Sequence, residues 1–404
     1  MNRITIFMPE STPIQNDDVK LEAALAPIIN KQGAEKLAFV DAMRGIAILL
    51  VMMVHSAISV PGINHSTRIL LEEGLRGVQL FFIASAFTLF LSMKNRAGRE
   101  RYATRNFFIR RFFRIAPMFY LGMGYYLLLK GLSPGENAPL GISASYIFCT
   151  ALFLHGWHPY MFNSVVPGGW SIAVEMNFYL LLPLMYKYIK DLTTAVSAFI
   201  GSVLISYLIP LVIFDMYPSC KPGLTWFLSW NCLPAQLPIF LTGIILFYIY
   251  EKYIVTVKMT IKKEAAYKQT GAGLSVLALT LFIGFSGFQH AYLSNSLLYG
   301  FVFLILAVGL ALNPIRLLVN SPMRYLGAVS FSAYLVHFTI LDLLKIANER
   351  LLAELRIPAM LDYILIMCSL VLLTALVSTV TYRFIEIPFQ NVGRNIIRRL
   401  EQCV

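Results

Sequence analysis

Arg44 and His55 are the two residues whose types and spacing point most directly to chemistry. Both lie in an apolar run, Leu37 to His55, that predicts a membrane-spanning helix. Eleven steps of about 100° return the two side chains to one helix face, about 16 Å apart along the axis. A guanidinium and an imidazole are costly in hydrocarbon, so such residues usually face a cavity, a partner or a substrate. We therefore predict that this face carries the chemistry, with the imidazole transferring a proton.

Each of these residues also has a purely structural explanation. Asp41 lies three residues before Arg44 and can pair with it. An ion pair that helps the helix cross the membrane explains Asp41 as well as function does. For His55 the alternative is a buried, hydrogen-bonded imidazole. The alignment of Arg44 with His55 favours a functional site.

A carboxylate follows in a second apolar run. Glu175 lies about one turn inside a helix that opens with the glycine pair after Pro167. A buried carboxylate needs a partner, and a histidine or an arginine is the natural one. We expect Glu175 to orient His55 or to balance its positive charge, like the third member of triad-type sites. A carboxylate stabilised by the helix dipole is the structural alternative.

Cations alternate with aromatic residues between Arg105 and Arg114, in a segment that we interpret as an inner loop. Contact with water and lipid headgroups explains much of this pattern. Arg111 and Arg114 nevertheless share one helical face that points toward the membrane. Arginine forms bidentate, charge-assisted hydrogen bonds, so this pair is a candidate phosphate-binding site.

A polar stripe lies in a later apolar segment. Ser330, Tyr334 and His337 fall on one helix face at spacings of four and three residues. Such a stripe suits the wall of a cavity, and polar packing between helices is the near-equal alternative.

Two further pairs of residues could bind metal or form a disulfide. His155 and His158 resemble a metal-binding pair, but no third ligand lies nearby in the sequence, so we predict no metal site. Cys220 and Cys232 share one loop that we place outside the membrane. A disulfide could persist there on an oxidising side, and the sequence leaves this open.

The composition indicates a polytopic membrane protein. The 404 residues are 58% hydrophobic and only 13% charged, whereas soluble domains carry about 25% charged residues. The mean hydropathy is +0.68. The net charge of +12 could suggest nucleic-acid binding. We exclude that function because the positive charge lies in short loops between apolar runs, as the positive-inside rule produces.

Most of the apolar segments approach the roughly 20 residues needed to cross a bilayer. The segment 141–156 is short and rich in flanking glycine, so we expect it to be re-entrant or interfacial. The predicted fold is therefore an all-α, polytopic integral-membrane bundle of about ten transmembrane helices plus this short segment. The predicted segments are 39–58, 75–93, 115–130, 141–156, 172–189, 194–214, 233–250, 271–289, 296–312, 325–345 and 362–384.

Basic segments predict the orientation. Eight Lys or Arg residues lie between positions 94 and 114, five lysines between 252 and 268, and four arginines after position 382. The positive-inside rule places all three segments in the cytoplasm. We expect a cytoplasmic tail over 1–36, a membrane domain over 37–390 and a cytoplasmic tail over 391–404, in the inner membrane of the cell. His55 and Glu175 then both lie toward the outer surface.

Together these features resemble the acyltransferase family 3 membrane proteins, which O-acylate surface carbohydrates and some small molecules. Arg44 and His55, with Asp41 and the Arg-Gly-Ile-Ala sequence, are similar to the signature first helix of that family. Gln79 stands where the family commonly has Asp, Ala86 where it commonly has Gly, and Met176-Asn177 where an acidic residue and Gln are usual. The further matching segments, in order, are Gly77–Phe87, Arg111 with Arg114, Trp170–Glu175, Leu326–His337 and Glu386–Pro388.

The resemblance implies acyl-CoA, most commonly acetyl-CoA, as donor, and a carbohydrate or lipid-linked glycan as acceptor, with no metal and no nucleic acid. Arg44 would neutralise the donor or lie along its pantetheine arm. His55 would act as general base or carry the acyl group briefly. The phosphates of CoA would bind Arg110, Arg111 and Arg114. The residues expected to line the substrate cavity are Asp41, Gln79, Trp170, Ser171, Ser330, Tyr334 and His337.

Two other functions compete with this hypothesis. A transporter or channel could use Arg44, Glu175 and His337 to line a permeation path. That class often shows inverted repeats or matching unwound helices, which the sequence does not reveal. A silent membrane scaffold would not need Arg44 and His55 on one face. The aligned pair favours the enzyme.

Overall fold

The computed structural model describes residues 38–260, 264–286, 295–351 and 357–402. Every regular element in those residues is a helix. Eight continuous helical stretches are long and apolar enough to cross a membrane. The helices α7 (Gly169–Tyr188) and α13 (Asn295–Leu312) add two more long apolar helices. This architecture confirms the predicted all-α, polytopic bundle. The predicted tail over 1–36 lies outside the described residues.

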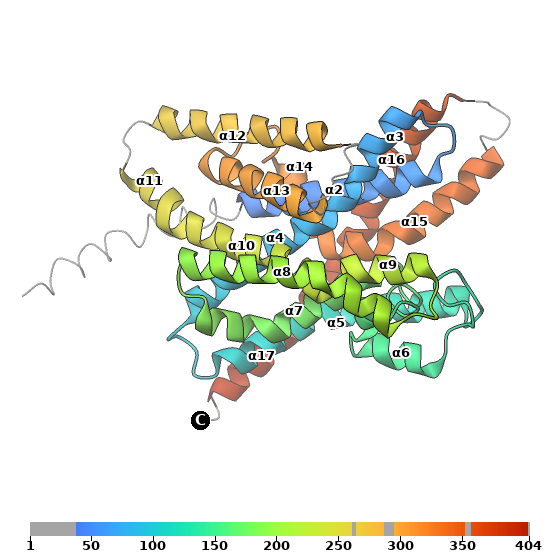
Figure 1. Cartoon of the computed structure of the whole chain (residues 1–404), viewed down its shortest axis with the longest axis horizontal. Helices are drawn as coiled ribbons and strands as arrows, with labels where there is room; N and C mark the ends of the chain where they lie inside the picture. The colour runs from blue at the N-terminus through green and yellow to red at the C-terminus, as the bar shows by residue number, and fades with distance from the viewer. Residues whose placement is uncertain (1–37, 261–263, 287–294, 352–356, 403–404) are drawn as a thin grey trace, which may run out of the picture.

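The helices cross one another at many angles rather than forming a parallel array (Figure 1). Several are continuous with their neighbours through short 3₁₀ or π turns, including η1 (Glu73–Arg76), η3 (Tyr250–Ile254) and η4 (Tyr382–Glu386). The other helices are α2 (Ala38–Ser59), α3 (His65–Glu72), α4 (Gly77–Arg96), α5 (Ala103–Lys130), α6 (Ala144–Ala151), α8 (Leu192–Met216), α9 (Pro222–Asn231), α10 (Leu233–Ile249), α11 (Val255–Thr260), α12 (Glu264–Phe285), α14 (Ser321–Ala328), α15 (Ser330–Leu351), α16 (Ala359–Thr381) and α17 (Ile387–Gln402).

Three segments deserve comparison with the prediction. The 141–156 segment contains only the eight-residue α6, about 12 Å long, which is too short to span a bilayer. The region 105–114, which we interpreted as a loop, is instead the first part of α5. Phe107 is buried there and Phe113 lies against Gly393 of α17, whereas Phe112 is exposed.

The predicted segment 325–345 is not one helix. It is divided at Val329 into α14 and α15. The second helix begins with a tertiary cap, because the buried carboxylate of Glu386 accepts hydrogen bonds from the Ser332 backbone N–H (3.1 Å) and hydroxyl. A carboxylate at this point satisfies an N–H group that a helix start leaves free. The break therefore depends on η4, which is 50 residues away in sequence.

Helix α2 lies against α4 and α14 (Figure 1), and glycines bring the backbones into contact. A Cβ on Gly327 would overlap the carbonyl oxygen of Asp41, and one on Gly45 would overlap that of Met323. At the start of α4, a Cβ on Gly77 would overlap the carbonyl oxygen of Ala47. These contacts fix the height and rotation of the segment that carries Asp41 and Arg44.

The three basic segments meet at one end of the bundle. Lys94, in the last turn of α4, forms an ion pair with Glu251 of η3. Asn106 of α5 donates a hydrogen bond of 2.8 Å to Glu401 of α17. The positively charged segments that we expect on one side of the membrane therefore do lie together.

We predict that Gly327→Ala lowers the free energy of unfolding by about 2 kcal/mol, because the added methyl group must push α14 away from α2. Gly201→Ala is the matched control, since Gly201 lies on α8 with no atom within 4 Å of a Cβ. Alanine is the better helix former there, so no loss is expected. Thermal unfolding in detergent compares the two variants. Equal unfolding temperatures would show that the α2–α14 contact does not need glycine.

Candidate active site

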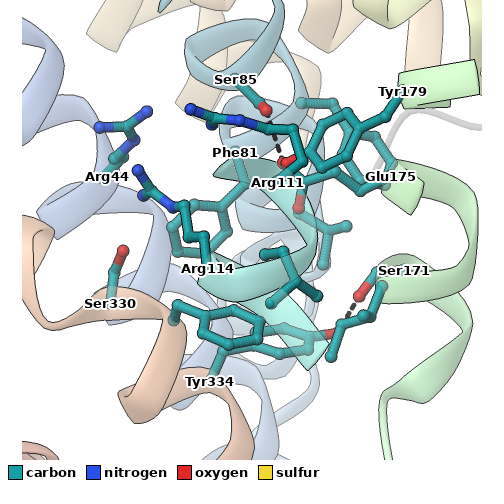
Figure 2. Close-up of a pocket in the computed structure, with 15 residues that line it drawn as sticks. Arg44, Phe81, Ser85, Arg111, Arg114, Ser171, Glu175, Tyr179, Ser330 and Tyr334 are labelled. Atoms are coloured by element: carbon teal, nitrogen blue, oxygen red, sulfur yellow. Dashed lines mark hydrogen bonds between the residues drawn. The ribbon is translucent and has the colours of Figure 1, made fainter. Parts of the chain in front are cut away.

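A pocket opens between α2, α4, α5, α7 and α15 (Figure 2). Polar and charged residues line one part of it, and aromatic and aliphatic residues line the rest. Its lining residues are Arg44, Val78, Phe81, Phe82, Ser85, Arg111, Arg114, Ile115, Ser171, Ile172, Glu175, Tyr179, Ser330, Phe331 and Tyr334. Sequence segments separated by nearly 300 residues thus meet around one space.

Three guanidinium groups converge in this pocket (Figure 2). Arg44 is held by Asp41, with 3.6 Å between Nη1 and Oδ1, and donates a 3.0 Å hydrogen bond to the Thr88 hydroxyl. Arg111 and Arg114 project together because they are three residues apart on α5. Within the described parts of the chain, neither of these two arginines forms an ion pair with a carboxylate. The Nε atom of Arg111 is buried without a hydrogen-bond partner there.

Glu175 lies beside these cations rather than beside His55. Its Oε1 accepts hydrogen bonds of 2.5 Å from the Ser85 hydroxyl and 2.6 Å from the Tyr179 hydroxyl. The pairing that we predicted between Glu175 and His55 is absent. Helix α7 begins with Gly168 against α15 and Gly169 against His155, and Glu175 lies about 9 Å along the axis from the start of the helix.

The far end of the pocket is formed by Tyr334 and Ser171. The Ser171 hydroxyl donates to the Tyr334 hydroxyl (2.8 Å), which donates to the Gly168 carbonyl (3.0 Å). Gly168 has φ +70°, and a Cβ there would lie 2.9 Å from the Phe338 ring. The sequence Gly-Gly-Trp-Ser therefore lets α7 start in contact with α15, because only glycine fits at this position.

His55 does not line this pocket, although Arg44 on the same helix does. Its ring lies 5.4 Å from that of His337 and 4.6 Å from that of Phe338, measured between centroids. Tyr334 connects the two regions: it lines the pocket and its ring lies 5.7 Å from His337. Of the predicted polar stripe, Ser330 and Tyr334 face the pocket and His337 faces His55.

Several predicted cavity residues lie near the pocket without lining it. Gln79 is buried and donates a 2.7 Å hydrogen bond to Ser296. Trp170 packs its ring edge-on against Phe82, and Asp41 pairs with Arg44. These residues support the pocket wall from behind.

Arg110 also points away from the pocket. It donates two hydrogen bonds, of 2.9 and 3.1 Å, to the carboxylate of Glu100 between α4 and α5. Burial opposes ionisation of that carboxyl, but the hydrogen bonds from Arg110 and Arg96 outweigh it and hold the pKa of Glu100 below its usual value. Of the three arginines that we predicted to bind phosphates, Arg111 and Arg114 line the pocket and Arg110 does not.

The remaining candidates have structural partners. His155 is buried, stacks on Phe119 and forms a 3.0 Å hydrogen bond with the Gly169 carbonyl through Nε2. His158 accepts a hydrogen bond from the Tyr160 backbone N–H. Cys220 and Cys232 are both free thiols in this structure.

The sequence analysis missed the neutral groups that hold the charged ones. Ser85 and Thr88 are three residues apart in α4, and each binds a charged partner, Glu175 and Arg44 respectively. Tyr179 follows Glu175 by four residues, the spacing at which helical side chains meet. Two features of the sequence could have predicted these contacts: the four-residue spacing of Glu175 and Tyr179, and the hydroxyl residues Ser85 and Thr88 within an apolar run.

Comparison with known proteins agrees with this geometry. A family model described as an acyltransferase domain matches residues 37–383. The peptidoglycan O-acetyltransferase OatA of Listeria monocytogenes is 22% identical over 372 residues, which cover 88% of this chain and 56% of that protein. The O-acetyltransferase OatA of Staphylococcus aureus is 27% identical over 234 residues, which cover 55% of this chain and 36% of that protein.

This chain thus spans only about half, or less, of the length of these relatives. No solved structure is significantly similar to it. The family model nevertheless covers every element that forms the pocket, from the start of α2 to the π turn η4. The protein therefore belongs to this family of membrane acyltransferases.

Proposed function

We propose that this protein moves an acyl group, most simply acetyl, from acyl-CoA to a hydroxyl of a surface carbohydrate or a lipid-linked glycan. Family membership supports acyl transfer, and the names of the two relatives support O-acetylation, in one case of peptidoglycan. The observation that carries the donor assignment is the pair Arg111 and Arg114, two cations that face a pocket without a carboxylate partner among the described residues.

Partly buried cations that form no ion pair are unfavourable, so a ligand anion is a natural partner for them. Phosphate suits guanidinium because it accepts paired, charge-assisted hydrogen bonds. CoA joins phosphates to a thioester through a long neutral arm. That shape matches a site with cations at one end and, about 16 Å further along α2, an imidazole.

In the transfer step, His55 takes the proton of the acceptor hydroxyl while the oxygen attacks the thioester carbonyl. The C–S bond breaks, and the CoA thiolate receives the proton back from His55. A variant of this scheme has the His55 ring carry the acyl group briefly before the acceptor attacks. Both schemes require that the pantetheine arm passes Tyr334, which separates the pocket from the histidines.

We assign Glu175 a role other than orienting His55. Fixed by Ser85 and Tyr179, its carboxylate offsets part of the positive charge of Arg44 and Arg111. The group formed by Arg44, Arg111, Arg114 and Glu175 therefore keeps a net positive charge that can attract an anion. The carboxylate also reduces the repulsion among the three guanidinium groups.

The positive-inside rule supports a cytosolic position for the donor end. The three basic segments gather at one end of the bundle, and α5 carries Arg111 and Arg114 into the membrane from that end. Both described termini of the membrane domain would then lie toward the cytosol. The acceptor would approach His55 from the opposite side.

We predict that His55→Ala abolishes acyl transfer while the protein remains folded and inserted, because no imidazole remains to take the hydroxyl proton. The measurement is transfer of label from radioactive acetyl-CoA to candidate glycans by purified protein. Normal labelling by well-folded His55→Ala protein would refute the assignment. Movement of a solute across vesicles without labelled product would instead favour a transporter.

We also predict that Arg114→Ala raises the KM for acetyl-CoA about tenfold to a hundredfold, the loss expected for a charged hydrogen bond to phosphate. Arg110→Ala is the matched control, because it removes a guanidinium from the same helix but outside the pocket. Its KM for acetyl-CoA should stay within about twofold of wild type. Equal effects of the two substitutions would show a general charge effect and remove Arg114 from the donor site.

A further inference from the structure

The hydrogen-bonding state of His337 can be derived from its surroundings. Its ring is fully buried in α15, and Nδ1 lies 2.7 Å from the Tyr334 carbonyl oxygen and 3.3 Å from that of Ala333. Carbonyl oxygens only accept hydrogen bonds, so Nδ1 carries a proton. In the neutral ring, Nε2 is then an acceptor with a free lone pair.

That acceptor has no hydrogen-bond partner among the described residues, although it is completely buried. A buried polar atom without a hydrogen bond is unfavourable, so its retention calls for an explanation. The ring of His55 is 5.4 Å away between centroids and tilted by 39°. Phe338 packs against both rings, at 4.1 Å from His337 and 4.6 Å from His55, and so holds the pair together.

We propose that His337 is the positioning residue for His55: a small turn of the His55 ring brings its N–H to the free Nε2 of His337, a hydrogen bond that is not formed in this structure, and this bond fixes the tautomer that leaves the other nitrogen of His55 bare. This inference rests on the proposed function of His55 as base or acyl carrier. A base must present a lone pair to the acceptor hydroxyl, and only a fixed tautomer presents it on the correct side. The structure gives Glu175 other partners, so the carboxylate cannot serve here.

The proton balance of the transfer step is consistent with this role. When His55 takes the hydroxyl proton, both of its ring nitrogens carry hydrogen and the ring becomes positive. The N–H that faces His337 then becomes a charge-assisted donor, which strengthens the bond to the neutral acceptor. The proton taken from the hydroxyl leaves again to the CoA thiolate, and His337 keeps its own proton throughout.

The same contacts tie the histidine pair to the donor pocket. The carbonyl of Tyr334 holds His337, while the hydroxyl of Tyr334 is bonded to Ser171 and Gly168 and lines the pocket. Helix α7, which carries Glu175, therefore helps to set the position of His337. The free Nε2 and the neighbouring ring of His55 distinguish His337 from a buried histidine used only for packing.

The test compares His337→Phe with His337→Gln. Phenylalanine keeps a ring among Tyr334 and Phe338 but has no acceptor, whereas the amide oxygen of glutamine reaches about as far as Nε2. We expect His337→Phe to lower kcat about a hundredfold with the KM for acetyl-CoA within about twofold of wild type. His337→Gln should retain at least about a tenth of wild-type kcat.

Nitrogen-15 NMR of labelled histidine provides a readout that packing alone would not change. The chain has only six histidines, and His55→Gln identifies the signal of His55. Wild-type protein should show His55 in one neutral tautomer, and His337→Phe should show both tautomers. This wild-type spectrum decides the matter even if His337→Phe fails to fold.

Three results would overturn the inference: wild-type kcat in folded His337→Phe, equal loss of activity in the Phe and Gln variants, or mixed tautomers of His55 in the wild type. Failure of the positioning role can be distinguished from failure of the proposed function. If His55→Ala is inactive and His337→Phe is fully active, only the positioning role fails. If His55→Ala is active, the proposed catalytic role of His55 fails with it.

Discussion

The structure depends on one electrostatic arrangement: three guanidinium groups share a pocket inside an apolar bundle, and among the described residues only Arg44 of these three forms an ion pair with a carboxylate. Asp41 pairs with Arg44, and Glu175 is held by hydroxyls near Arg44 and Arg111. Such an arrangement is unfavourable in the absence of a bound anion. It is the property expected of a site that must attract a phosphorylated donor into the membrane.

The rest of the fold keeps these charges in place through close backbone contacts and helix breaks. Gly327 lets α14 touch α2 next to Asp41, and Gly168 lets α7 start against Tyr334. The carboxylate of Glu386 caps the start of α15, and Arg114 lies within its electrostatic range. One buried acid thus joins the break between α14 and α15 to the cation cluster.

Much of this could be predicted from residue types and spacing. The long apolar helices, the short segment at 141–156, and the shared helical face of Arg111 and Arg114 all follow from hydropathy and helical periodicity. The Ser85 partner of Glu175 could not be predicted, because it depends on how α7 meets α4. The separation of Arg110 from Arg111 also depends on tertiary contact, with Glu100. Periodicity places side chains on a face but does not say which neighbouring helix meets that face.

The central claim is that one elongated donor spans from the arginines to the histidines. The most direct measurement is an electron cryomicroscopy structure of the full chain with CoA bound. The account predicts phosphate oxygens within hydrogen-bond distance of Arg111 and Arg114, and the CoA sulfur on the far side of Tyr334, beside His55 and His337. A bound CoA whose phosphates lie elsewhere, or whose sulfur points away from the two imidazoles, would contradict it.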